Sequence, residues 1–196
     1  MLNALILAGG RGTRMGTDKG LLRYHGLPQR QYLAELLRPL CAEVWVSLRA
    51  DQAPLPGEQV LPDEKPDAGP LSGIRAAFAH RADCAWLSVP CDWPLLTART
   101  LGYLIGARQP GYLATVFRDP HAGTLEPLLT CWEAAAAAPL AAAWARGERS
   151  PRRWLGAVPV RVLDMPFPEE WGTANTPAEA KVLMERLRAE RSEKRV

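Results

Sequence analysis

The residues most able to do chemistry stand near the start of the chain, directly after a short apolar run. Residues 4–7 are typical of a strand buried on both faces, and four glycines and three cations follow between Leu7 and Lys19. Glycine lets the backbone approach a ligand closely, and successive free N–H groups in such a loop bind anions. Arg11, Arg14 and Lys19 add positive charge. The segment therefore predicts a cradle for phosphate groups.

This loop fits neither of two widespread nucleotide-binding patterns. The dinucleotide pattern G-x-G-x-x-G fails because Met15 stands where the third glycine belongs. The P-loop requires Gly-Lys followed by Ser or Thr, whereas Lys19 follows Asp18 and precedes Gly20. A different class of nucleotide-binding protein is therefore indicated.

Composition narrows the class of protein. The chain has 196 residues, of which 47% are hydrophobic and 23% charged, which suits one sizeable core, and no apolar run is long enough to cross a bilayer. Because no secretory signal precedes the first strand, we expect a cytoplasmic protein with no membrane partner.

The net charge of +3 is mild and no basic block carries interleaved aromatics, which argues against a nucleic-acid partner. Four widely spaced cysteines lack metal-ligand spacing, and we expect them in or near the core.

Strand-like and helical segments alternate along the chain. Strands are expected at residues 4–7, 44–48, 59–61, 85–89, 112–117, 125–132 and 160–163, with Pro127 indicating a sheet edge or an irregularity. Helices are expected after Pro28, at about 70–80, 97–107 and 133–146 with a break at Pro139, near 150–155, and from Thr176 onward. This alternation predicts one α/β domain over residues 1–187, with a Rossmann-like, doubly wound, parallel-dominated sheet. The charged residues 188–196 are expected to fray.

Three polar segments follow strands in this scheme. Ligands of doubly wound sheets bind at the carboxyl ends of the strands, so the glycine-rich loop, Asp63 and Asp92 should converge there. Asp92 stands between Pro90 and Pro94, which restrict the backbone around it. One such carboxylate can hold Mg²⁺ together with waters and phosphates, although capping of the next helix is an alternative explanation for Asp92.

Four blocks in this order resemble the molybdenum cofactor guanylyltransferases, which are MobA-like nucleotidyltransferases, over nearly the whole chain. They are L-A-G-G-x-x-x-R-M-G-x-D-K at 7–19, P-D at 62–63 with G-P-L-S-G-I at 69–74, P-C-D-W-P at 90–94, and N-T-P at 175–177. Sugar-phosphate nucleotidyltransferases share the Gly-Thr-Arg start, but they usually carry a longer insert before the lysine. The short interval from Arg14 to Lys19 therefore favours the guanylyltransferases.

The resemblance implies a nucleotide-diphospho-sugar transferase type of fold and a Mg²⁺-dependent reaction. GMP would pass from GTP to molybdopterin carrying molybdenum, forming the guanine dinucleotide cofactor and pyrophosphate, with contacts to proteins that deliver or accept the cofactor. The site residues that it implies are Leu7, Ala8, Gly9 and Asp63 for the guanine nucleotide, Lys19 for its phosphates, Arg14 for charge stabilisation, and Asp92 for magnesium. Asn175 is either an acceptor-site residue or a turn residue ahead of Thr176.

Departures from the family pattern leave alternatives open. Thr173 and Ser47 stand where many relatives have asparagine, and we assign neither a role. Residues 147–153 are either an anion site for the pterin phosphate or a solvated basic helix. The alternative functions are a cytidylyltransferase, which usually carries Leu-Ala-Ala-Gly, a sugar-1-phosphate nucleotidyltransferase, and a GTP-binding module without turnover.

Overall fold

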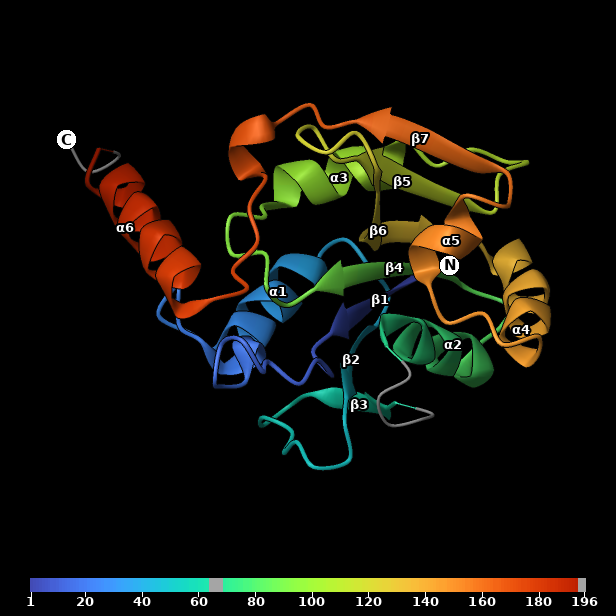
Figure 1. The fold of residues 1–196 in the computed structure, drawn as a ribbon, viewed down its shortest axis with the longest axis horizontal. Helices are drawn as coiled ribbons and strands as arrows, with labels where there is room; N and C mark the ends of the chain where they lie inside the picture. Colours follow the sequence, from blue (N-terminus) through green and yellow to red (C-terminus); the bar gives the residue numbers. More distant parts are fainter. Residues whose placement is uncertain (64–68, 194–196) are drawn as a thin grey trace.

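The computed structural model describes residues 1–63 and 69–193, in which seven strands form one sheet (Figure 1). The strand order is β3-β2-β1-β4-β6-β5-β7. The strands are β1 (Leu2–Leu7), β2 (Val44–Leu48), β3 (Gln59–Pro62), β4 (Ala85–Pro90), β5 (Ala114–Arg118), β6 (Leu125–Trp132) and β7 (Val160–Asp164). β6 is antiparallel to both neighbours, β4 and β5, whereas the remaining pairs are parallel. The predicted α/β fold with a parallel-dominated sheet is confirmed.

Helices cover both faces of the sheet, as a doubly wound fold requires. The helices are α1 (Gln29–Leu37), α2 (Pro70–His80), α3 (Ala98–Gly106), α4 (Ala137–Ala145), α5 (Pro151–Leu155) and α6 (Pro177–Glu193), with 3₁₀ turns η1 (Lys19–Leu21), η2 (Ala134–Ala136) and η3 (Pro168–Glu170). Ile6 and Val89 belong to the core cluster with α1 and α3, and Leu5 and Trp86 to the cluster with α2, α4 and α5. Because both faces are covered, β1 and β4 are continuous apolar runs rather than alternating ones.

Pro127 marks an irregularity and not a sheet edge. β6 lies inside the sheet, where it pairs with β4 at residues 130–132. Its pairing with β5 involves residues 130–132 and Leu125, with a shift of register between these two sets. Proline has no N–H to give to a ladder, so an internal strand tolerates it only where the pairing is interrupted. Of the two expectations for Pro127, a sheet edge or an irregularity, the irregularity is confirmed.

The last helix packs on the glycine-rich loop through the apolar stripe expected from the sequence. Ala180, Leu183, Met184 and Leu187 cluster with Met15 and Tyr24. At the start of α6, Glu179 N donates to Thr176 Oγ1 (3.3 Å) and Thr176 N donates to Glu179 Oε2 (3.1 Å), which is a capping box.

The charged end of the chain continues α6 as far as Glu193, past residue 188 where fraying was expected. Alanine, glutamate and arginine are strong helix formers, so this segment favours a helix without an apolar stripe. Residues 194–196 lie outside the described part of the chain. Among the described residues, no helix combines the length and the apolar character needed to cross a membrane.

Candidate active site

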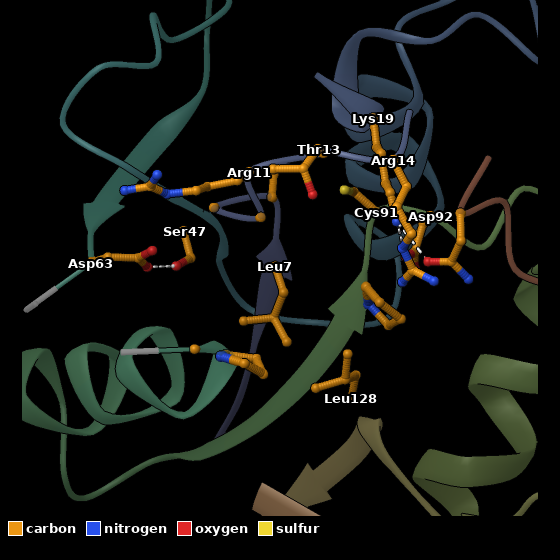
Figure 2. Close-up of a pocket in the computed structure, with 18 residues that line it drawn as sticks. Leu7, Arg11, Thr13, Arg14, Lys19, Ser47, Asp63, Cys91, Asp92 and Leu128 are labelled. Carbon is orange, nitrogen blue, oxygen red and sulfur yellow. Dashed lines mark hydrogen bonds and ion pairs between the residues drawn. The ribbon is translucent and has the colours of Figure 1, made fainter. Parts of the chain in front are cut away.

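A pocket of about 370 Å³ opens where β1, β2, β3 and β4 end (Figure 2). It is lined by residues 7–14 and Lys19 after β1, by Ser47 of β2, by Asp63 after β3, by residues 90–92 at the end of β4, and by Gly69, Pro70, Leu128 and Asn175. All eight residues assigned to the site from the sequence are among them: Leu7, Ala8, Gly9, Arg14, Lys19, Asp63, Asp92 and Asn175. The expected convergence at the carboxyl edge of the sheet is confirmed.

Glycines shape the loop that follows β1. Gly12 has φ of +57°, and a Cβ atom there would overlap the carbonyl oxygen of Thr17. The amide groups of Met15 and Gly16 both donate to the Gly12 carbonyl, at 2.9 and 2.8 Å, which closes a turn. Met15 is buried and holds this turn against α6. The loop therefore has a fixed path around the pocket.

Lys19 joins three loops at one end of the pocket. Its Nζ lies 3.0 Å from Asp92 Oδ2 and donates to Asn175 Oδ1 at 2.7 Å. Asp18 caps the turn that begins at Lys19, because its Oδ1 accepts from Gly20 N at 2.8 Å. Figure 2 shows Arg14 beside this cluster. This end of the pocket carries the cations suited to phosphate groups and one carboxylate suited to a metal ion.

The backbone on either side of Asn175 is held against Asp92 and α6. Ala174 N donates to the Asp92 carbonyl oxygen (2.8 Å), and Asn175 N donates to Glu179 Oε2 (2.6 Å). The Asn175 side-chain amide donates to Thr173 Oγ1 (3.1 Å), so Thr173 orients it from the position where relatives often carry asparagine. Asn175 is therefore a turn residue before α6 whose side chain also lies in the pocket.

Asp63 lies at the other end of the pocket with Ser47, a residue to which the sequence pattern assigns no role (Figure 2). The Ser47 hydroxyl donates to Asp63 Oδ1. Burial raises the pKa of the Asp63 carboxyl, and the Ser47 hydrogen bond and the charge of Arg49 offset part of this increase. Ser47 could have been found from its position near the end of β2, since ligands bind at strand ends.

Two glycines make room for this pair. A Cβ at Gly9 would overlap the Asp63 carboxylate, and a Cβ at Gly73 would overlap Ser47 Oγ. Neither glycine has a positive φ, so the requirement is for space and not for an unusual backbone conformation. Leu128 reaches the same pocket from β6, and nothing in the sequence pattern marks it as a site residue.

The basic segment 147–153 is engaged in structural contacts. The Arg149 guanidinium lies 3.8 Å from the centre of the Trp144 ring and donates to the Trp144 carbonyl (2.8 Å). Arg152 donates to the Leu125 carbonyl (3.1 Å), and Arg153 lies 3.4 Å from Glu148. These contacts give no support to a separate anion site there, and they favour the alternative of a basic structural helix.

A magnesium ion fits this site only as part of a substrate complex. Among the described residues, no group of three or more His, Cys, Asp and Glu side chains is arranged to hold a metal. Mg²⁺ commonly takes one or two carboxylates and completes its shell with phosphate oxygens and waters. Asp92 matches that requirement as a single ligand.

Comparison with known proteins shows that the chain is a nucleotidyltransferase. Residues 4–162 match the MobA-like NTP transferase domain. The chain is 34% identical over 180 residues to the molybdenum cofactor guanylyltransferase of Ectopseudomonas mendocina, covering 89% of this chain and 88% of that protein. It is 40% identical over 157 residues to the protein of the same name from Pseudomonas syringae pv. syringae, covering 77% of each. The chain belongs to the MobA-like NTP transferase family.

A solved structure shares the fold. Molybdopterin-guanine dinucleotide biosynthesis protein A from Archaeoglobus fulgidus superimposes with a TM-score of 0.75 at 21% identity, covering 93% of this chain and 97% of that one. At this identity the likeness concerns the fold alone. The expected nucleotide-diphospho-sugar transferase type of fold is thereby confirmed.

Proposed function

We propose that this nucleotidyltransferase transfers GMP from GTP to molybdopterin carrying molybdenum, with Mg²⁺, in the cytoplasm. The curated relatives named above carry the corresponding name at 34% and 40% identity over most of the chain. The single observation that carries the proposal is the pocket with two chemically different ends. Its volume of about 370 Å³ lies within the range of small-molecule sites, roughly 300–1,000 Å³.

The Asp63 end suits a guanine base. Guanine presents N1–H and N2–H donors, which a carboxylate can accept together, whereas cytosine offers one amino donor beside two acceptors. Figure 2 shows Arg11 extending toward this end, where a guanidinium could donate to the guanine O6 and N7 acceptors. Leu7, Ala8 and Gly9 would line the base and sugar, since they connect β1 to the loop.

The Lys19 end suits the triphosphate. Lys19 and Arg14 would neutralise the phosphates and stabilise the charge that develops on the leaving pyrophosphate. Asp92 would hold Mg²⁺ together with phosphate oxygens, and the ion would supply further charge neutralisation at those oxygens. Asn175 belongs to the segment before α6 and contacts Lys19 from outside the glycine-rich loop. From this position its side chain could contact the acceptor substrate.

The reaction requires little covalent work from the protein. A terminal phosphate oxygen of the acceptor forms a bond to the α-phosphorus of GTP, the bond from the α-phosphorus to the bridging oxygen breaks, and pyrophosphate leaves with that electron pair. The protein's contribution is to hold the two phosphates in line and to stabilise the charge.

Pyrophosphate release tests the proposal. Wild-type protein, Mg²⁺ and molybdenum-loaded molybdopterin are combined with GTP, CTP or UTP, and then GTP is combined with sugar 1-phosphates as acceptors. Rapid release with GTP and the molybdopterin acceptor supports the proposal. Preference for CTP, turnover of sugar phosphates, or GTP binding without pyrophosphate release would each overturn it in favour of the corresponding alternative.

The variant Asp92→Ala tests the site itself. Its turnover should fall by roughly 10²–10³-fold or more, because the phosphates lose the metal that balances their charge. The matched control is Asp164→Asn, since the Asp164 side chain at the end of β7 is 94% exposed. Wild-type turnover in Asp92→Ala would remove Asp92 from the mechanism.

A further inference from the structure

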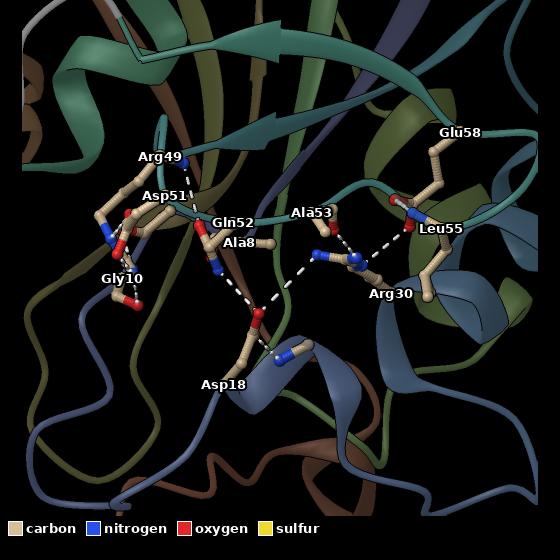
Figure 3. A network of polar contacts seen from close by, with 12 residues as sticks. Ala8, Gly10, Asp18, Arg30, Arg49, Asp51, Gln52, Ala53, Leu55 and Glu58 are labelled. Atoms are coloured by element: carbon tan, nitrogen blue, oxygen red, sulfur yellow. Dashed lines mark hydrogen bonds and ion pairs between the residues drawn. The ribbon is translucent and has the colours of Figure 1, made fainter.

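A network of polar contacts joins the glycine-rich loop to α1 and to residues 49–58, which connect β2 and β3 (Figure 3). Asp18 is its first member. While Oδ1 caps the turn at Lys19, Oδ2 accepts from Gln52 Nε2 at 2.8 Å. Gln52 Nε2 also donates to the Ala8 carbonyl at 3.0 Å. One amide group therefore links the start of the loop to its end.

Arg30, the second residue of α1, lies next to Asp18 and is 1% exposed. Its Nη1 lies 3.8 Å from Asp18 Oδ2, and its Nε lies 2.9 Å from Glu58 Oε1. Its Nη2 donates to the Ala53 carbonyl at 2.7 Å. Arg30 therefore connects the end of the glycine-rich loop with residues 49–58, the connector between β2 and β3 (Figure 3).

The connector also holds the loop backbone directly. Arg49 Nη1 donates to the carbonyls of Gly9 (2.9 Å) and Gly10 (2.6 Å), and Arg49 N donates to Gln52 Oε1 (2.9 Å). In a trans peptide the C=O and the N–H point in opposite directions. The carbonyls of residues 8–10 face the connector, so the N–H groups of residues 9–11 point away from it.

Ion pairing alone does not account for a buried arginine at this position. Removing charges from water is costly, and well-packed apolar residues often stabilise a core as well as a buried ion pair does. What the guanidinium provides here is contact with several groups at once, because its planar fork carries three nitrogens. Nη2 donates to the Ala53 carbonyl, while Nη1 and Nε pair by charge with Asp18 and Glu58.

We propose that Arg30 is a positioning residue for the nucleotide site. Through Asp18 and the connector it holds the N–H groups of residues 9–11 and the Lys19 ammonium in the arrangement that receives the triphosphate. This inference rests on the proposed function for its ligand, GTP, but the positioning of the loop can be measured without that ligand.

The experiment compares Arg30→Met/Glu58→Gln with the same substitutions in another arginine–glutamate pair of the chain. The double substitution removes both charges of the Arg30–Glu58 pair, and Asp18, whose side chain is 19% exposed, keeps its hydrogen bonds from Gly20 N and Gln52 Nε2. The new glutamine side chain keeps an oxygen for the Leu55 amide, from which Glu58 Oε2 accepts at 2.7 Å. The control is Arg108→Met/Glu133→Gln. Arg108 and Glu133 form a two-point ion pair (2.7 and 2.6 Å) that is more exposed than the Arg30–Glu58 pair and lies just beyond the end of β6, where none of the pocket residues lies.

Two measurements are made on each protein. Hydrogen exchange of residues 8–20 in the nucleotide-free state should rise by about tenfold in the Arg30 variant and stay unchanged in the control. The KM for GTP should rise by roughly tenfold or more in the Arg30 variant, with the KM for the acceptor unchanged, because only the nucleotide side loses its alignment. Equal behaviour of the two variants in exchange and in KM for GTP would overturn the proposal.

The outcome separates this inference from the proposed function. If wild-type protein neither binds GTP nor releases pyrophosphate, the proposed function fails, and the exchange measurement still decides whether Arg30 positions the loop. If wild-type protein is active and the Arg30 variant exchanges and binds GTP as the control does, only the role of Arg30 fails.

Discussion

The ammonium of Lys19 lies 3.0 Å from the carboxylate of Asp92, although 73 positions separate the two residues along the chain. Their side chains are 19% and 20% exposed, so solvent screens the pair only in part. A triphosphate would compete with Asp92 for this ammonium, and phosphate-bound magnesium would compete with Lys19 for the carboxylate. We therefore expect nucleotide binding to exchange the partners of two charges that already face the pocket.

Lys19→Met should lower kcat/KM for GTP by roughly 10²-fold or more, because the substitution keeps the length of the side chain but removes its charge from the phosphates. The Tm should change little, since Asp92 keeps access to water. Steady-state kinetics and calorimetric binding of GTP measure the effect. Lys181→Met, on an exposed position of α6, is the control. An unchanged kcat/KM in Lys19→Met would contradict the phosphate cradle.

The affinity for GTP should depend on pH through Asp63. Burial raises the pKa of this carboxyl, and guanine donors need it ionised. GTP binding should therefore weaken as the pH falls through the raised pKa, at a higher pH than for an exposed aspartate. The ratio of wild-type affinity to that of Asp63→Asn, measured by titration calorimetry at each pH, cancels the titration of the nucleotide itself. A ratio that does not change with pH would exclude Asp63 from base binding.

The ionisation of Asp63 should also affect folding stability. Whereas the affinity for GTP should rise with pH, the free energy of unfolding should fall. The folded state binds the Asp63 proton more tightly than the unfolded state does, so its contribution to the free energy of unfolding is lost as the pH rises from the unfolded pKa through the folded one. Asp63→Asn should remove this loss. Denaturant unfolding of both proteins across that pH range gives the comparison.

The location of the site could be predicted from the sequence, because its main residues follow strands. Leu7, Asp63 and Asp92 stand at the carboxyl ends of β1, β3 and β4, and parallel strands bring those ends to one edge. The apolar runs and the capping residues in the sequence were enough to predict where the strands and the longer helices lie. Strand order was beyond such reasoning, because the insertion of antiparallel β6 between β4 and β5 depends on pairing and not on periodicity.

The contacts that hold the site in place could not be predicted. Asn175 meets Lys19 across 156 positions, a distance that no local pattern encodes. The sequence marks residues 50–57 only as a polar, proline-rich connection, yet Gln52 within it and Arg49 just before it hold the loop carbonyls. The sequence shows Arg30 as one position of an amphipathic helix, and its burial and its contact with Asp18 become evident only in the structure.

Gly9→Ala should weaken GTP binding by roughly tenfold, about 1.4 kcal/mol, without unfolding the protein. The added Cβ would overlap the Asp63 carboxylate, which Ser47 holds by a hydrogen bond, so the carboxylate must leave its position. Gly102→Ala is the control, because a Cβ on this exposed position of α3 meets nothing within 4 Å. It should leave the kinetics unchanged and raise the free energy of unfolding by about 0.5–1 kcal/mol. If Gly9→Ala binds GTP with wild-type affinity, the position of the Asp63 carboxylate does not matter for nucleotide binding.

Glu170→Gln should weaken acceptor binding and lower the free energy of unfolding by roughly 1.5–3 kcal/mol. The buried Glu170 carboxylate accepts from Thr97 N (3.2 Å), Thr100 Oγ1 (2.6 Å) and Arg99 Nε (3.0 Å), and its backbone carbonyl accepts from Trp93 Nε1 (2.8 Å). These bonds fasten the segment leading to Asn175 onto the first turn of α3, just after the Asp92 loop.

Thermal unfolding and the KM values for GTP and for the acceptor measure both effects of Glu170→Gln. Glu169→Gln is the matched control, because Glu169 is 54% exposed and also pairs with Arg99, an exposed contact worth about 0–1 kcal/mol. The KM for the acceptor should rise in Glu170→Gln while the KM for GTP stays near the wild-type value, since Asn175 is expected to face the acceptor. If the two variants have equal Tm and equal KM for the acceptor, Glu170 does not position this side of the site.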